Sequence, residues 1–203
     1  MVWWPFLKKE GRRNMGKIVL VTGGARSGKS TFAEAYLKDK DPVLYIATAI
    51  AYDEEMQWRI LHHQKSRSRQ WETLEAFANI LEKLEKKKTA YGGILLDCIT
   101  VMLTNLLFLR EDLQEDRYDA PFWTTFEEDM RKELKQLLEY FQGLPGDTVL
   151  VTNEIGGGLV PETPISRAFR DVAGRMNQLL AKEADEVYLM VSGLPLKLKG
   201  ASS

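Results

Sequence analysis

The chain has 203 residues, which predicts one domain large enough to bury a full hydrophobic core. Its 28 basic and 29 acidic residues nearly cancel, so the composition excludes a general attraction to nucleic acid or to anionic membranes. The single cysteine, Cys98, excludes a disulfide framework and a metal site of paired thiolates, and it fits a reducing cytoplasm. No run approaches the roughly 20 apolar residues of a membrane span, so we expect a soluble protein without stable membrane insertion.

The first residues, 1–14, differ in character from the rest of the chain. They read MVWWPFLKKEGRRN, with an aromatic patch before basic residues, which is the reverse of a secretory signal. The patch of Trp3, Trp4 and Phe6 is too short to anchor a protein to a membrane surface by itself. We therefore expect a disordered or alternative-start extension, with Met15 opening a single domain over residues 15–203.

Apolar runs and helical periodicity alternate along the rest of the chain. Strands are predicted at KIVLVT, VLYIATA, ILLDCIT, TVLVTNE and EVYLMVSG, which start at residues 17, 43, 94, 148 and 186. Helices are predicted over residues 29–38, 53–65 and 74–88, and on two amphipathic faces, Phe126, Met130, Leu134, Leu137, Phe141 and Ile165, Phe169, Val172, Met176, Leu179. The polar residues 110–121 are expected to form a flexible insert. The pattern predicts an open, mostly parallel α/β sheet with helices on both faces.

The segment GGARSGKS follows the first predicted strand and opens the first predicted helix. It matches the phosphate-binding pattern G-x-x-x-x-G-K-[ST], in which glycines let backbone N–H groups approach phosphate oxygens. The lysine of this pattern reaches the outer phosphates. The hydroxyl of the serine or threonine that follows the lysine can bind Mg²⁺. A glycine turn that matches by chance is disfavoured by the flanking strand and helix. We predict a P-loop NTPase-like fold with a nucleotide site formed by Gly23, Gly24, Ala25, Arg26, Ser27, Gly28, Lys29, Ser30 and Thr31.

Two carboxylates end predicted strands and are candidates to complete this site. Asp97 is placed to share Mg²⁺ with Ser30, although a strand-end aspartate can also cap a turn. Glu154 is a second candidate, as a ligand of a metal-bound water or as a general base. The sequence does not rank the two residues, and a P-loop alone does not define the reaction.

Five segments in order resemble the bifunctional adenosylcobinamide kinase and adenosylcobinamide-phosphate guanylyltransferase family. They are GGARSGKS, YIATA, DEEMQWRILHHQKSRSRQWETLE, LLDCIT and VTNEIGGGLVPETPISRAFRDVAGRMNQLLA. The resemblance runs from Met15 to about Lys199. It implies phosphorylation of adenosylcobinamide, a corrinoid, with ATP or GTP, followed by transfer of GMP from GTP onto the new phosphate in cobalamin biosynthesis.

The resemblance also implies roles for particular residues. His62 corresponds to the histidine that carries GMP as a covalent intermediate, and Mg²⁺ is the implied cofactor. A homotrimer is implied in the same way. The implied guanine-nucleotide contacts are Ala49, Ile50, Ala51, His63, Gln64, Lys65, Ser66, Glu75 and Asp97.

Reasoning from the residues alone leaves alternatives to these roles. Adjacent histidines such as His62 and His63 are often exposed surface groups, and on a helix they point too far apart to share a metal. The basic run KSRSR is equally a solvated segment, because nothing aromatic is interleaved for RNA. Two other functions therefore remain: a small-molecule kinase without nucleotidyl transfer, and a nucleotide-switched binding protein.

Overall fold

A computed structural model describes residues 15–50, 71–114 and 118–200. The strands are β1 (Ile18–Gly23), β2 (Val43–Ala47), β3 (Glu72–Glu75), β4 (Gly93–Asp97), β5 (Asp147–Val151), β6 (Glu186–Val191) and β7 (Leu194–Lys199). The helices are α1 (Lys29–Leu37), α3 (Ile80–Glu85), α4 (Ile99–Phe108), α5 (Ala120–Gln142), η1 (Ile155–Gly157, a 3-10 turn) and α6 (Pro164–Glu183). None of the described helices is long and apolar enough to cross a membrane.

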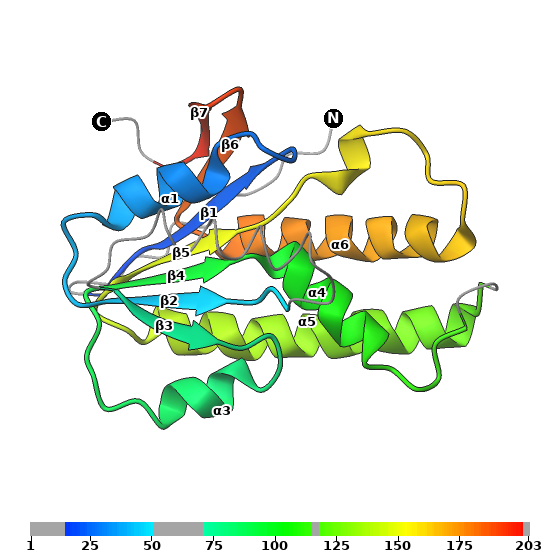
Figure 1. Ribbon diagram of the computed structural model, residues 1–203, viewed down its shortest axis with the longest axis horizontal. Coiled ribbons are helices and arrows are strands. Elements are labelled where there is room, and N and C mark those ends of the chain that lie inside the picture. Colours follow the sequence, from blue (N-terminus) through cyan, green and yellow to red (C-terminus); the bar gives the residue numbers. More distant parts are fainter. Residues whose placement is uncertain (1–14, 51–70, 115–117, 201–203) are drawn as a thin grey trace.

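The strands form one seven-stranded sheet in the order β3-β2-β4-β5-β1-β6-β7. All neighbouring pairs are parallel except β6 and β7, which form an antiparallel hairpin at one edge. Parallel strands present all their carboxyl ends at the same side of the sheet, so the loops after β1, β2, β3, β4 and β5 meet there. Figure 1 shows this side at the arrowheads of the strands.

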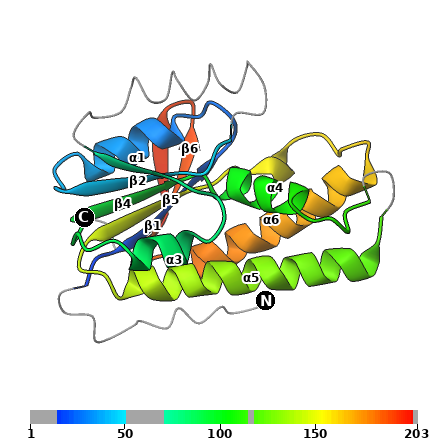
Figure 2. The same cartoon turned by 60° about the horizontal axis from the view of Figure 1, so that its bottom comes forward.

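Helices cover both faces of the sheet, as the sequence predicts (Figure 2). On one face, Ala33 and Leu37 of α1 pack with Val19, Val21 and other strand residues. On the other face, α3, α4, α5 and α6 pack against Ile18, Leu20 and their neighbours. The amphipathic faces are confirmed where they matter most, because Phe126, Met130, Leu134, Leu137, Phe141, Val172 and Met176 are all buried.

Three sequence-based assignments differ from the structure. Residues 74–88 are not one helix, since Leu74 and Glu75 belong to edge strand β3 and the helix runs only from Ile80 to Glu85. The apolar run from Ile94 to Thr100 is not one strand either, because β4 ends at Asp97 and α4 begins at Ile99. In both runs apolar residues resume soon after the boundary, which is why hydrophobic periodicity misses it. The hairpin strand β7 was also not predicted, and the helix predicted over residues 53–65 lies outside the described residues.

Candidate active site

The phosphate loop joins β1 to α1 at the carboxyl side of the sheet. Gly23 is the last residue of β1, and Gly28 is the N-cap of α1 with a left-handed φ of 94°. A Cβ on Gly23 would lie 2.6 Å from the backbone oxygen of Met190, so β6 leaves no room there for a side chain. Arg26 also has a positive φ, of 56°. The loop therefore takes the curled backbone that turns successive N–H groups toward an anion.

Lys29 is folded back onto this loop. Its Nζ donates to the carbonyl oxygens of Gly23 at 3.1 Å and Gly24 at 2.6 Å, and the residue is buried. Burial lowers the pKa of Lys29, while the nearby Cys98 and Asp97 act in the opposite direction. A cation held in the loop by two carbonyls is positioned to meet phosphate oxygens there.

The hydroxyl of Ser27 is buried without a hydrogen-bond partner within the described residues. Such a group is uncommon in a folded interior, because leaving it unsatisfied is costly. The hydroxyl lies against Gly23, 2.8 Å from where a Cβ on that glycine would stand. Residues Gly23 to Thr31 form the end of β1, the loop after it and the start of α1.

Glu75, an implied nucleotide contact, and Asp97, a strand-end candidate, lie in one row of the sheet. Ala47 is in register with Glu75 on one side and with Asp97 on the other, and Asp97 pairs in turn with Val151. Both carboxylates therefore end their strands at the same level, at the carboxyl end of the sheet. Ala49 and Ile50 follow β2 at that edge and are half-buried. Ala51, His62, His63, Gln64, Lys65 and Ser66 lie outside the described residues.

Asp97 is fixed by a residue that the sequence reasoning missed. The hydroxyl of Tyr45 donates to Asp97 Oδ2 at 2.9 Å from the neighbouring strand β2. Cys98 follows in a buried position, where desolvation raises its thiol pKa to about 12 and disfavours the thiolate. Tyr45 sits within an apolar strand run, and only the strand register reveals that it faces Asp97.

Glu154 is held against the phosphate loop by both its backbone and its side chain. Its N–H donates to Gly23 O at 3.1 Å, and its Oε1 accepts hydrogen bonds from Thr22 Oγ1 at 2.7 Å and Asn177 Nδ2 at 3.1 Å. Asn177 Oδ1 accepts a further hydrogen bond from the buried hydroxyl of Thr152 at 2.8 Å. Sequence reasoning found Glu154 but not Thr22 or Asn177, because Asn177 comes from the far helix α6.

The oxygen ligands at the carboxyl end of the sheet suffice for Mg²⁺ only together with ligands from the nucleotide and from water. A serine hydroxyl and carboxylate oxygens are the ligand types that this ion prefers, and Ser30 and Asp97 supply them. Among the described residues, no group of three or more histidine, cysteine, aspartate or glutamate side chains is arranged to hold a metal ion. Phosphate oxygens and water would therefore complete the coordination, as is usual for Mg²⁺ with a nucleotide.

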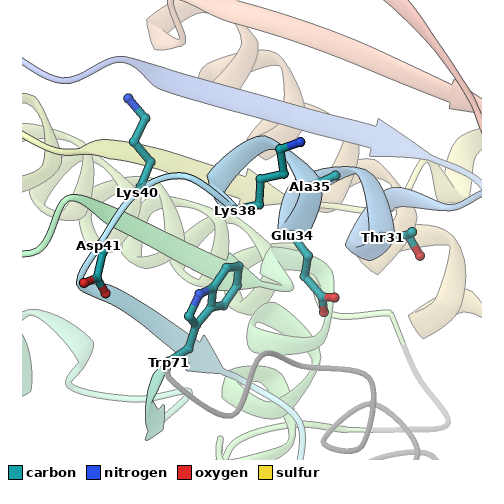
Figure 3. Close-up of a pocket in the computed structure, with 7 residues that line it drawn as sticks. All are labelled: Thr31, Glu34, Ala35, Lys38, Lys40, Asp41 and Trp71. Carbon is teal, nitrogen blue, oxygen red and sulfur yellow. The ribbon is translucent and has the colours of Figure 1, made fainter.

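A polar pocket of about 480 Å³ runs along α1 beside the loop (Figure 3). Trp71, which precedes β3, lies across from Glu34 of α1, and Asp41 lies at one end of the pocket. Thr31 belongs both to this pocket and to the predicted phosphate site. The other lining residues are Ala35, Lys38 and Lys40.

The sheet order, the curled loop with its buried lysine and the strand-end carboxylates define an α/β nucleotide-binding protein of the P-loop class. The chain matches the model of the cobinamide kinase / cobinamide phosphate guanyltransferase family over residues 19–198, and it belongs to that family. The bifunctional adenosylcobalamin biosynthesis protein CobU of Escherichia coli is 45% identical over 183 residues, 90% of this chain and 99% of the relative. CobP of Pseudomonas aeruginosa is 41% identical over 89% of this chain and 96% of the relative.

Solved structures share the fold at low sequence identity. The protein PH0250 of Pyrococcus horikoshii has a TM-score of 0.53 at 10% identity, covering 94% of this chain and 90% of that chain. An ATPase of a type III secretion system has a TM-score of 0.53 at 9% identity, covering 86% of this chain and 52% of that chain. At these identities the likeness concerns the fold alone.

Proposed function

We propose that the protein phosphorylates adenosylcobinamide and then transfers GMP from GTP to adenosylcobinamide phosphate, which gives adenosylcobinamide-GDP. The observation that supports this most directly is a phosphate loop with two strand-end carboxylates at its side in a chain of the cobinamide kinase / cobinamide phosphate guanyltransferase family. The relatives named above are bifunctional proteins of adenosylcobalamin biosynthesis.

In the kinase step, the substrate hydroxyl oxygen attacks the γ-phosphorus of ATP or GTP, and the nucleoside diphosphate leaves. The loop N–H groups and Lys29 hold the phosphates, so most of the catalysis is positioning and charge stabilisation. Ser30 and Asp97 would hold Mg²⁺, which offsets the charge of the phosphates when bound. We assign to Glu154 the role of accepting the hydroxyl proton, because Thr22 and Asn177 orient its carboxylate at the edge of the loop.

In the second step, an imidazole nitrogen of His62 attacks the α-phosphorus of GTP. A phosphorus–nitrogen bond forms and pyrophosphate leaves. An oxygen of cobinamide phosphate then attacks the same phosphorus, and the bond to His62 breaks. Splitting the transfer in this way lets two large substrates use one site in turn. The remaining proposed nucleotide contacts are Ala49, Ile50, Ala51, His63, Gln64, Lys65, Ser66 and Glu75.

The covalent step gives the sharpest test of this function. GTP labelled at the α-phosphate should leave acid-labile, base-stable label on the wild-type protein and on His63→Ala, but none on His62→Ala. Label that survives in His62→Ala would refute the assignment of the nucleophile. Phosphorylation of adenosylcobinamide without any trapped label would instead indicate a kinase that performs no nucleotidyl transfer.

We also propose a homotrimer in the cytoplasm, by resemblance to the family. Sedimentation equilibrium should then give a mass three times that of the chain. A monomeric mass at micromolar concentration would reject the trimer while leaving the chemistry untouched.

A further inference from the structure

A second, apolar pocket of about 290 Å³ lies between α4, η1 and the first turns of α6. Its apolar lining consists of Leu107, Phe108, Ile155, Pro161, Ile165 and Phe169. Phe108 is 55% exposed although it is a large apolar side chain, and in the adjoining loop Leu159 is 95% exposed. An exposed apolar surface around a hollow is typical of a place where a ligand or another molecule docks.

Two of the elements that line this pocket begin at the carboxylates of the active site. Helix α4 starts two residues after Asp97, and η1 starts directly after Glu154. With a rise of about 1.5 Å per residue, Phe108 lies roughly 13 Å along α4 from its first residue. The pocket therefore shares two elements with the candidate active site, and its Phe108 wall lies at a distance that an extended side arm of a substrate can span.

The polar side chains that line the pocket are Thr104, Ser166 and Arg170. Arg170 lines it and makes no ion pair with any of the described residues, whereas Arg167 and Arg175 on the same helix are both engaged. Arg167 donates to the carbonyl oxygens of Pro161 and Glu162, at 3.0 Å and 2.6 Å, and so fixes the loop that forms one wall. The pocket thus combines an apolar floor with a guanidinium that has no acidic partner among the described residues.

We propose that this α4–α6 pocket binds the edge of the corrin ring of the corrinoid substrate, an inference that rests on the proposed function. A corrin ring has methyl groups and primary amide arms at its edge. The methyl groups would lie on Phe108 and Phe169, and an amide carbonyl would accept a hydrogen bond from Arg170. The aminopropanol arm would then extend toward Glu154 and the phosphate loop. The pocket is too small for the whole macrocycle, so the rest of the ring would lie over the exposed Leu159.

The alternative occupant is a second copy of this chain. The position of the pocket favours the corrinoid, because η1, which lines the pocket, begins directly after Glu154. Arg170, which has no ion-pair partner in the part of the chain that the structure describes, favours it as well, since a carbonyl-rich ligand satisfies a guanidinium without needing a buried carboxylate from another chain.

Equilibrium dialysis of dicyanocobinamide against the full chain tests this proposal, with the visible absorption of the corrinoid as the readout. Phe108→Asp and Arg170→Ala should each weaken corrinoid binding about tenfold or more, which corresponds to about 1.4 kcal/mol. Leu109→Asp is the matched control for Phe108→Asp, because Leu109 is the next residue, is 57% exposed and does not line the pocket. Lys135→Ala removes one exposed positive charge from α5 and is the control for Arg170→Ala.

Labelling by GTP and the oligomeric mass are measured on the same variants. The proposal predicts that both are unchanged in Phe108→Asp and Arg170→Ala. Corrinoid affinities within twofold of wild type in both variants would overturn it. A fall in oligomeric mass in Phe108→Asp alone, with unchanged corrinoid affinity, would overturn it too and assign the face to a subunit contact. Failure of the proposed function is separate, since it appears as a wild-type protein that neither binds nor phosphorylates a corrinoid.

Discussion

Gly193, at the turn between β6 and β7, donates its backbone N–H to the carbonyl oxygen of Ser27 in the phosphate loop at 2.9 Å. The Cα of Gly193 also lies 3.1 Å from where a Cβ on Gly28 would stand. The antiparallel hairpin at the edge of the sheet therefore supports the far side of the loop, while Glu154 contacts it through Gly23 O. The conformation of the loop depends on both supports.

Gly28→Ala should damage the phosphate loop in two ways at once. Its φ of 94° is strained for any side chain, and the new Cβ would press on the backbone of Gly193. We expect the free energy of unfolding to fall by about 1–3 kcal/mol. The affinity for ATP and GTP should fall at least tenfold, measured by calorimetric titration. Nucleotide affinity equal to wild type would show that the hairpin does not support the loop.

Gly174→Ala is the counterpart at a glycine without these constraints. Gly174 lies in the interior of α6, and a Cβ there meets no atom within 4 Å. Because glycine loses more backbone entropy on folding than alanine, we expect a gain of about 0.5–1 kcal/mol in the free energy of unfolding. Urea titration monitored by circular dichroism measures it, with nucleotide affinity unchanged. A loss of stability would mean that this face of α6 is occupied in the assembled protein.

Glu186→Gln should cost stability in a pH-dependent way. Burial raises the pKa of Glu186, but hydrogen bonds from Lys17 at 2.8 Å and Tyr188 at 2.7 Å outweigh it, and the net pKa lies below its usual 4.5. Since the folded pKa is depressed, the carboxylate contributes stability above the unfolded pKa and loses it as the pH falls through the folded value. At pH 7 the variant should be less stable by about 1–3 kcal/mol.

The stability difference between Glu186→Gln and wild type should shrink as the pH falls below about 4.5. Urea midpoints measured from pH 7 down to pH 3 follow this convergence. Glu128→Gln, at an exposed position of α5, is the matched control and should leave the free energy of unfolding within about 0.5 kcal/mol of wild type throughout. A gap between Glu186→Gln and wild type that stays constant with pH would contradict the role of the charge.

The fold was predictable from sequence where hydrophobic periodicity is unambiguous. The central strand β1, the phosphate loop and the long helices α5 and α6 follow directly from their patterns. The boundary between β4 and α4 was missed, because the buried apolar residues Cys98 and Ile99 resume directly after Asp97 and extend the apparent strand. Hairpin strand β7 was missed because Leu194, Leu196 and Leu198 alternate on an exposed face, outside any buried run.

The motif residues of the candidate site were predictable from the sequence. The residues that hold them by hydrogen bonds were not. The sequence identifies Gly23 and Lys29 by the phosphate-loop pattern. It identifies Asp97 and Glu154 by their residue type near strand ends. It does not identify their partners, because a tyrosine in an apolar strand or an asparagine in a long helix has no local signature of a site. Tyr45 meets Asp97, 52 residues away in sequence, only through the pairing of β2 with β4. Asn177 reaches Glu154 only because α6 returns beneath the sheet.

Glu154→Gln tests the assignment of the kinase base. The variant keeps the volume and an acceptor oxygen for Thr22 and Asn177, but it removes the group that takes the hydroxyl proton. We expect kcat for phosphorylation of adenosylcobinamide to fall by about 10²–10⁴-fold, the usual contribution of general-base catalysis, with GTP affinity within twofold of wild type. Covalent labelling by GTP should persist, because that step needs no base at this position. Glu162→Gln, an exposed neighbour in the loop after η1, is the control and should retain full activity. A Glu154→Gln enzyme with wild-type kcat would move the proton acceptor elsewhere and leave Glu154 as a support of the phosphate loop.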